Sequence, residues 1–239
     1  MNEHVHLGEL HMTSGDLPAT PWPYIERGVS LSGKTYRRIK DLLLSCELEP
    51  GKPLNEIALS RRLGISRSPL REALRQLQEE CLVETWARGV RATPVTRRGI
   101  LELYELRLAL ESFAARQAAG RIKDDDVAVA EAGLEQTAAP LAKGDVRPFT
   151  NSDFEFHDLY VRNCGNTLLI DRIGRLRDHL RRVWNHVGIR IEDTILAYQE
   201  HLEILAAIRT ADSVILQQAV ERHIAAVGKR VSACVIDDG

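Results

Sequence analysis

The chain of 239 residues has little of several residue types that define specialised protein classes. Its four cysteines, at positions 46, 81, 164 and 234, form no CxxC pair. This excludes a disulfide-stapled scaffold and a zinc ribbon, and we expect reduced thiols. Only 5% of the residues are aromatic, and no apolar run approaches the ~20 residues of a membrane-spanning helix. The polar, acidic start does not resemble a signal peptide, so we expect a cytoplasmic protein without a membrane partner.

The chain also lacks a strong net charge, since its formal charge is −2, but the charges are unevenly distributed. Residues 31–98 carry 14 Lys and Arg against 8 Asp and Glu, a net charge of +6. Residues 99–239 carry 17 against 22, a net charge of −5, and residues 1–30 carry 1 against 4. A basic segment followed by an acidic one predicts a nucleic-acid-binding domain attached to a body with another task.

What the chain does contain is a helix-turn-helix pattern between residues 54 and 74. A short amphipathic helix ends at Gly64, and Ser66 is suited to cap the next helix. Guanidinium groups on the early turns of a second helix are typical of a helix that enters the DNA major groove. The alternative is an ordinary helical hairpin with a solvated basic face. The residues that we expect to contact DNA here are Ser66, Arg67, Ser68, Arg71 and Arg75.

The flanks of this pattern predict a winged helix. A helix is expected over residues 35–46, and two strand-like runs, 82–86 and 90–95, follow the second helix of the motif. Arg88-Gly89 forms the turn between these strands. At the tip of such a wing we expect Arg88 and Arg91 to meet phosphates or a minor groove.

These segments share a recognisable set of residues: Pro50-Gly51, Leu54, Glu56, Leu63-Gly64-Ile65-Ser66-Arg67, Pro69, Arg71-Glu72-Ala73-Leu74, Leu77, Leu82-Val83 and Gly89. With them, residues 34–95 resemble the DNA-binding domain of the GntR superfamily of bacterial transcription factors. Two positions depart from the family pattern: Ser68 replaces the usual threonine, and Cys81 replaces a common glycine. The resemblance implies a regulator, most often a repressor, that binds a pseudo-palindromic double-stranded DNA operator as a homodimer.

From Thr96 onward the pattern is helical, which predicts an antiparallel bundle of about six helices. Leu103, Leu106, Leu110 and Phe113 step by 3, 4 and 3 in a helix that stops at Gly120. Further helices are expected over residues 124–142, 149–164, 167–187, 192–209 and 212–234. The predicted fold is therefore mostly α. It has a mostly disordered arm over 1–30, an N-terminal winged helix-turn-helix over 31–97, and an all-α antiparallel helical bundle over 98–234.

Three of the predicted helices direct histidines toward the interior of the bundle. Asp153 and His157 lie one turn apart on one apolar face, and His201 and His223 lie on the apolar faces of two other helices. A divalent transition metal prefers such nitrogen and oxygen ligands, and the cores of helical bundles hold such sites. The alternative is that these histidines only pack in the core.

A second resemblance covers residues 98–230 and rests on Arg107, Leu110-Glu111, Phe156-His157, Gly165-Asn166, Glu200-His201, Ile204-Leu205, Asp212 and His223. The segment resembles the FCD effector domain of the FadR-like GntR subfamily. This implies that Asp153, His157, His201 and His223 bind a divalent ion, such as zinc, nickel or manganese. The ion would lie at the floor of a cavity that takes a small carboxylic acid. Arg107 matches a family position and is the first residue expected to contact this effector; Arg177, Arg181 and Asn185 are further expectations.

Together these features predict a ligand-responsive, DNA-binding transcriptional regulator and not an enzyme. Two alternatives are a metal-dependent enzyme fused to a DNA-binding domain and an acyl-CoA sensor that lacks metal. The absence of an obvious spare general base beside the predicted ligands disfavours the enzyme. The complete set of one aspartate and three histidines disfavours the metal-free sensor.

Overall fold

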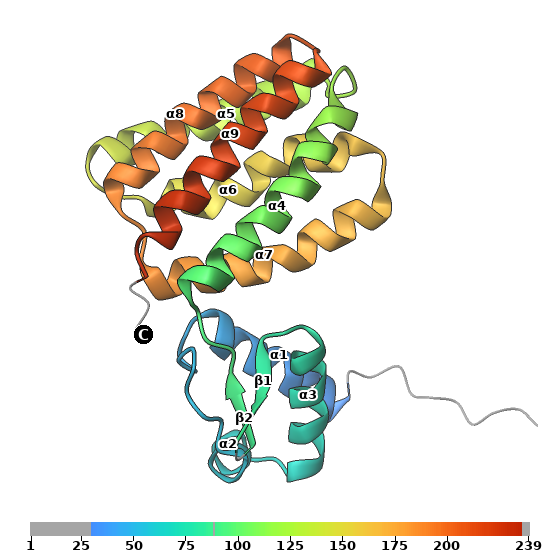
Figure 1. Ribbon diagram of the computed structural model, residues 1–239, viewed down its shortest axis with the longest axis vertical. Helices are drawn as coiled ribbons and strands as arrows, with labels where there is room; N and C mark the ends of the chain where they lie inside the picture. Colours follow the sequence, from blue (N-terminus) through green and yellow to red (C-terminus); the bar gives the residue numbers. More distant parts are fainter. Residues whose placement is uncertain (1–29, 88, 236–239) are drawn as a thin grey trace, which may run out of the picture. The chain divides into compact units, whose positions relative to one another are not determined.

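The computed structural model describes residues 30–87 and 89–235 (Figure 1). Over these residues the chain forms helices α1 to α9, one short 3-10 helix and one two-stranded sheet. The fold is mostly helical, as predicted. The arm over residues 1–29 and Arg88 lie outside the described residues, so what was expected of them stays a prediction.

The first part of the described chain has the predicted order of helix, helix, helix and hairpin. Its elements are α1 (Leu31–Leu44), α2 (Glu56–Leu63), α3 (Arg67–Glu79), β1 (Val83–Trp86) and β2 (Gly89–Ala92). The strands pair antiparallel, with Val83 opposite Ala92 and Trp86 opposite Gly89. Beneath the helices lies an apolar core that includes Ile39, Leu43, Leu70, Leu77 and Leu82, all with 0% exposure.

Local backbone chemistry explains the turns around α2 and α3. The side chain of Asn55 accepts hydrogen bonds from two backbone N–H groups at the start of α2, and Gly64 ends that helix with a left-handed φ of 67°. Ser66 occupies the N-cap position of α3, but its side chain makes no capping hydrogen bond. Cys81 adopts a φ of 57°. The cysteine thus keeps the left-handed turn that glycine favours at this position.

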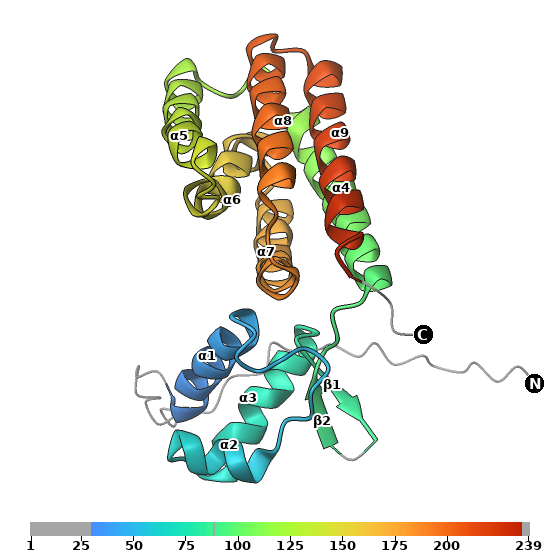
Figure 2. The ribbon, with the colours of Figure 1, turned by 90° about the vertical axis from the view of Figure 1, so that its left-hand side faces the viewer.

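The second part consists of α4 (Arg97–Ala118), α5 (Asp124–Ala142), α6 (Arg147–Val161), η1 (Arg162–Cys164), α7 (Thr167–Val187), α8 (Ile191–Arg209) and α9 (Ser213–Ser232). Helix α9 packs along both α4 and α8, and α5 packs on α6 (Figure 2). Side-chain caps define three of the starts: Thr96 for α4, Asn166 for α7 and Asp212 for α9. None of the helices described is both long enough and apolar enough to cross a bilayer.

Helix α4 buries a face that is partly charged. Of the stripe that predicted this helix, Leu106 is 50% exposed and Phe113 is 49% exposed on the outer side, while Leu103 and Leu110 are partly buried against the core. Arg107 and Glu111 are buried instead, with Tyr104 and three alanines of the same helix. The backbone of α9 lies close to α4, because a Cβ added at Gly228 would lie 2.8 Å from the Cβ of Tyr104. The 3-4-3 spacing therefore indicated the helix correctly without indicating which side is buried.

Candidate functional site

Three histidines from three helices meet in the core of the second part. His157 of α6, His201 of α8 and His223 of α9 are at most 2% exposed. One ring nitrogen from each lies within 4.8 Å of the others. Asp153, one turn before His157, joins them: its Oδ1 is 3.6 Å from His201 Nε2, and its Oδ2 is 3.9 Å from His157 Nε2. The structure thus brings together all four predicted metal ligands.

Several polar atoms of this cluster have no hydrogen-bond partner within the part of the chain that the structure describes. They are Asp153 Oδ2, His223 Nε2 and both ring nitrogens of His201. A buried polar atom without a partner costs free energy, and native proteins contain few of them. Imidazole nitrogens with one carboxylate are suitable ligands for a divalent transition ion. The residues present therefore fit a metal site.

Two carboxylates orient two of the three imidazole rings through their Nδ1 atoms. Glu200 lies 2.8 Å from His223 Nδ1, and Glu111 lies 2.7 Å from His157 Nδ1. An ionised carboxylate can only accept, so each Nδ1 donates and each Nε2 keeps its lone pair. Such outer partners set the tautomer of metal-binding histidines. The Tyr160 hydroxyl also donates to Glu111.

Arg107 is a buried cation beside this cluster, with 1% exposure. Its Nε donates to Glu111 over 2.9 Å, and one terminal nitrogen lies 3.1 Å from His157 Nε2 and 3.8 Å from Asp153 Oδ2. Burial alone would lower the pKa of Arg107, but the carboxylates of Glu111 and Asp153 outweigh this and raise it. Burial alone would raise the pKa of Glu111, but Arg107 and His157 hold it well below its usual range. Both groups are therefore charged.

The two other histidines stay neutral. Burial lowers the pKa of His201 well below its ordinary value, and the neighbouring His223 and His157 lower it further. Burial also lowers the pKa of His223, although the hydrogen bond to Glu200 acts in the opposite direction. Neutral imidazole is the form that binds a metal.

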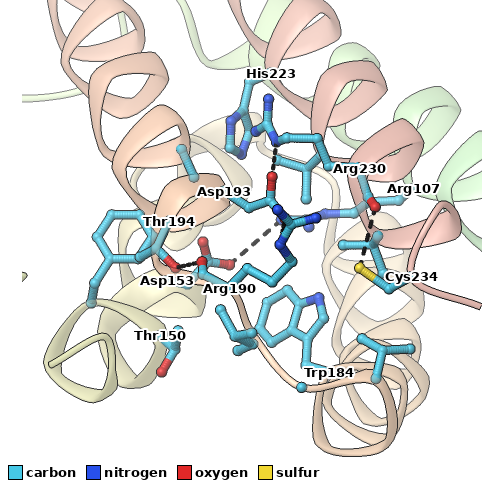
Figure 3. Close-up of a pocket in the computed structure, with 17 residues that line it drawn as sticks. Arg107, Thr150, Asp153, Trp184, Arg190, Asp193, Thr194, His223, Arg230 and Cys234 are labelled. Atoms are coloured by element: carbon cyan, nitrogen blue, oxygen red, sulfur yellow. Dashed lines mark hydrogen bonds and ion pairs between the residues drawn. The ribbon is translucent and has the colours of Figure 1, made fainter. Parts of the chain in front are cut away.

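A cavity of about 70 Å³ opens beside the cluster (Figure 3). Arg107, Asp153 and His223 line it on the side of the histidines. The other walls come from α6, α7, α8, α9 and the segment between α7 and α8, and they are mostly apolar. Their polar members are Thr150, Arg190, Asp193, Thr194 and Arg230. The site can thus admit a small molecule next to the carboxylate of Asp153 and the imidazole of His223.

The residues predicted to contact an effector divide into two groups. Arg107 lines the cavity, but Arg177, Arg181 and Asn185 do not. Arg177 pairs with Asp158, Arg181 lies 6.0 Å from the centre of the Phe154 ring, and the Asn185 amide donates to the Leu44 carbonyl. Arg177 and Arg181 lie on the same side of α7 as Trp184, but they contact Phe154, whose ring stacks on Trp184, and do not reach the cavity.

The sequence analysis missed Arg190 and Arg230, which do line the cavity. Arg230 follows His223 by seven residues on α9 and therefore shares its face, a signal that was available in the sequence. Arg190 lies between α7 and α8, where no periodicity could indicate its direction.

The predicted DNA-contacting residues lie on the outer surface of the winged helix. Ser66, Arg67, Ser68, Arg71 and Arg75 are all exposed. Arg67 and Arg71 border a hollow of about 490 Å³ between α2, α3 and the wing, together with Trp86. Trp86 is 43% exposed, and the sequence analysis did not single it out.

Most of these arginines already have acidic partners. Arg71 Nε lies 2.8 Å from Glu56, Arg75 pairs with Glu79, and Arg91 lies 2.7 Å from Glu84. Exposed ion pairs of this kind are weak. A phosphate or a base can therefore displace the carboxylates at little cost.

Comparison with known proteins extends this picture. The family model "Bacterial regulatory proteins, gntR family" matches residues 31–91, and the FCD domain model matches residues 102–226. The regulator YdhC of Bacillus subtilis is 27% identical over 80% of this chain and 84% of its own length. The repressor RspR of Escherichia coli is 26% identical over 82% and 86%. The structure of E. coli McbR/YncC shares the fold, with a TM-score of 0.66 and 21% identity over 87% of this chain and 98% of that one.

Proposed function

Because this chain belongs to the gntR family of bacterial regulatory proteins and carries an FCD domain, we propose that it represses transcription in response to a small carboxylic acid. The chain is a transcriptional regulator, and its matched families and relatives are regulators and not enzymes. A repressor output is supported by the name of the relative RspR. The proposed parts are an operator-binding winged helix, a metal site and an effector cavity.

The metal site is supported above all by the unpartnered atoms of a buried ligand set. Asp153, His157, His201 and His223 would hold one divalent ion. Zinc or nickel suits the nitrogen-rich set, while the carboxylate also allows manganese. When bound, the ion supplies positive charge and a coordination position for a carboxylate. Arg107 now donates toward His157 Nε2, so it has to give up that contact when the ion binds.

The effector site is supported by the cavity, because Asp153 and His223 border it directly. The carboxylate of an acid bound there would contact the ion, on the side of the cavity that Arg107 lines. Its binding would favour one arrangement of the regulator over another, which is a coupling free energy between effector and operator. A cavity of about 70 Å³ does not favour the large acyl-CoA of the metal-free alternative.

The proposed homodimer is supported by the outer side of α4. Leu106 and Phe113 lie two turns apart there, and each is about half exposed. Half-exposed large apolar side chains aligned on one helix are typical of a protein interface. Two copies joined by a two-fold axis would suit a pseudo-palindromic operator. Phe113→Asp should therefore yield monomers in sedimentation experiments, whereas Glu105→Ala, an exposed change on the same helix, should not.

The metal proposal is tested by elemental analysis together with thermal unfolding. An ion that binds only the folded chain stabilises it by RT ln(1 + [L]/Kd), so chelation should lower the melting temperature. His201→Ala should lose the ion, and His186→Ala, an exposed histidine of α7, should keep it. Wild-type protein that takes up none of the three ions would contradict the proposal.

Operator binding is tested by arginine substitutions. Arg67→Ala should cost about 1–3 kcal/mol at the operator if Arg67 reads a base. Arg91→Ala should weaken binding to all DNA sequences alike. It should also reduce the slope of log K against log[salt] by roughly one, as expected for the loss of one phosphate contact. We expect the same of Arg88. Arg116→Ala on α4 serves as the control, since this exposed arginine lies outside the winged helix.

A further inference from the structure

We infer that the effector carries a single negative charge on an apolar body, as a short monocarboxylate does, and that dicarboxylates and tricarboxylates are disfavoured. The inference rests on the proposed metal and carboxylate function and names the chemical class of its ligand. Two observations carry it: the pairing of every arginine around the cavity, and the apolar character of the walls.

Each arginine that lines the cavity already has a carboxylate partner. Arg107 bonds Glu111 over 2.9 Å. Arg230 holds Glu200 with two hydrogen bonds of 2.7 and 2.8 Å. Arg190 Nε lies 3.7 Å from Glu192 and 3.9 Å from Asp193, and Figure 3 shows Arg190 and Asp193 among the residues that line the cavity. The positive charge of each of the three arginines is thus already balanced by at least one carboxylate.

The buried charges lead to the same conclusion. The guanidinium of Arg107 lies among two carboxylates, those of Glu111 and Asp153, so with the imidazoles counted as neutral metal ligands the buried cluster has a net charge of −1. A divalent ion changes this to +1, and one carboxylate then brings it to zero. A second carboxylate would add a negative charge with no cation to balance it. Uncompensated charge in a buried site is strongly unfavourable.

Arg230 cannot easily be released to bind a second carboxylate. Its partner Glu200 also accepts the hydrogen bond from His223 Nδ1, and Arg230 lies 4.0 Å from Asp193 as well. Taking Arg230 away would leave Glu200, which is half-buried, without its strongest counter-charge. Breaking a bidentate arginine–carboxylate pair costs more than breaking a single hydrogen bond. The pair thus works against acids that carry a second charge.

The walls indicate what the rest of the effector looks like. Phe149, Trp184, Val187 and Val227 present apolar surface to the cavity. The uncharged polar residues are Thr150 and Thr194, and the Thr194 hydroxyl already donates to the Arg190 carbonyl over 2.9 Å. A short alkyl chain suits these walls better than a polyhydroxy acid, because it leaves no hydroxyl without a partner.

The test compares acids of equal chain length on the zinc-loaded full chain by isothermal titration calorimetry. The pairs are butyrate with succinate and pentanoate with glutarate. Butyrate and pentanoate should bind at least about 10-fold more tightly than their dicarboxylate counterparts, which corresponds to a difference of roughly 1.4 kcal/mol in binding free energy. Dicarboxylates that bind as tightly or more tightly overturn the inference.

Asp193→Asn sharpens this test, because it removes a carboxylate from Arg190 and Arg230 without touching a metal ligand. The preference for butyrate over succinate should shrink by about threefold or more, as expected for one partly screened charge. Glu203→Gln is the matched control: Glu203 is an exposed carboxylate on the same helix and does not line the cavity. An unchanged preference in Asp193→Asn contradicts the charge argument.

The outcomes also separate this inference from the proposed function. If acids bind the zinc-loaded protein but not the chelated protein, and dicarboxylates bind best, only the inference fails. If no acid binds in either state, the proposed effector function fails and the inference fails with it.

Discussion

The winged helix and the helical domain use their cores in different ways. The winged helix buries aliphatic side chains such as Leu70, Leu77 and Leu82 and carries its arginines on the surface. The helical domain also has an apolar core, but it buries Arg107, Glu111 and the proposed metal ligands as well. In the winged helix, the residues that stabilise the fold are thus separate from the arginines that are expected to contact DNA. In the second domain the two sets overlap, and the proposed ion would complete the core.

The largest effect should come from breaking the charged core of the helical domain. Glu111→Ala leaves Arg107 buried without its main counter-charge, and removing one member of a buried ion pair costs about 3–5 kcal/mol. Thermal and denaturant unfolding measure this loss. The control Glu105→Ala changes an exposed residue on the same helix and should stay within about 0.5 kcal/mol. A loss below about 1 kcal/mol for Glu111→Ala would show that the charged cluster contributes little to stability.

A cavity in the core of the winged helix should cost about as much or slightly less. Leu77→Ala removes a side chain with 0% exposure, and such truncations cost about 2–5 kcal/mol. We expect operator affinity to fall as this domain unfolds, while metal content by elemental analysis stays unchanged. Glu72→Ala, an exposed change on α3, controls for stability. If Leu77→Ala also lost metal, the two cores would not be separate.

A smaller effect should follow from adding one methyl group between α4 and α9. In Gly228→Ala the new Cβ would lie 2.8 Å from Tyr104, and overpacking costs about 1–3 kcal/mol. Gly174→Ala on α7 is the matched control, because no atom lies within 4 Å of its added Cβ. That control should gain about 0.5–1 kcal/mol from helix propensity. Equal melting temperatures for the two variants would contradict the close packing of α4 on α9.

The smallest effect concerns pH and the surface of the winged helix. Burial alone would raise the pKa of Glu80, but hydrogen bonds from Lys40 and Tyr36 lower it below its ordinary value of 4.5. A lowered folded-state pKa means that the stabilisation is present above pH 4.5 and is lost as the pH falls through the folded-state value. Because the pair is only partly buried, we expect about 0.3–1 kcal/mol.

Chemical unfolding of the wild type and Glu80→Gln between pH 3 and 6 checks this prediction. The difference in stability between the two proteins should narrow toward the acidic end. Glu79→Gln controls for an exposed carboxylate, since the Glu79 side chain is 64% exposed. If the difference in stability stays constant over this range, folding does not lower the pKa of Glu80.

The elements of both domains could be predicted from local sequence alone. Gly64, Asn166 and Asp212 terminate or cap helices through interactions within a few residues, so the bounds of α2, α7 and α9 followed from the chain itself. Asp153 and His157 share a face because they lie four residues apart, and this required only helical geometry. The apolar spacing around His201 and His223 turned both of them toward the same interior, and the resemblance to known families then indicated that they complete the set.

Which face each helix buries was decided by the tertiary structure. Hydrophobicity alone favours burial of the side of α4 that carries Leu106 and Phe113. The side that carries Arg107 and Glu111 is buried because α6 supplies its polar partners and α9 packs against α4. The pairing of Arg230 with Glu200, and the position of Arg190 beside Asp193, likewise join residues of different segments. The sequence by itself determined the helices and the residue types of the proposed metal site, since these depend on near neighbours along the chain. The charge balance of the cavity depends on groups distant in sequence, and only the folded chain brings them together.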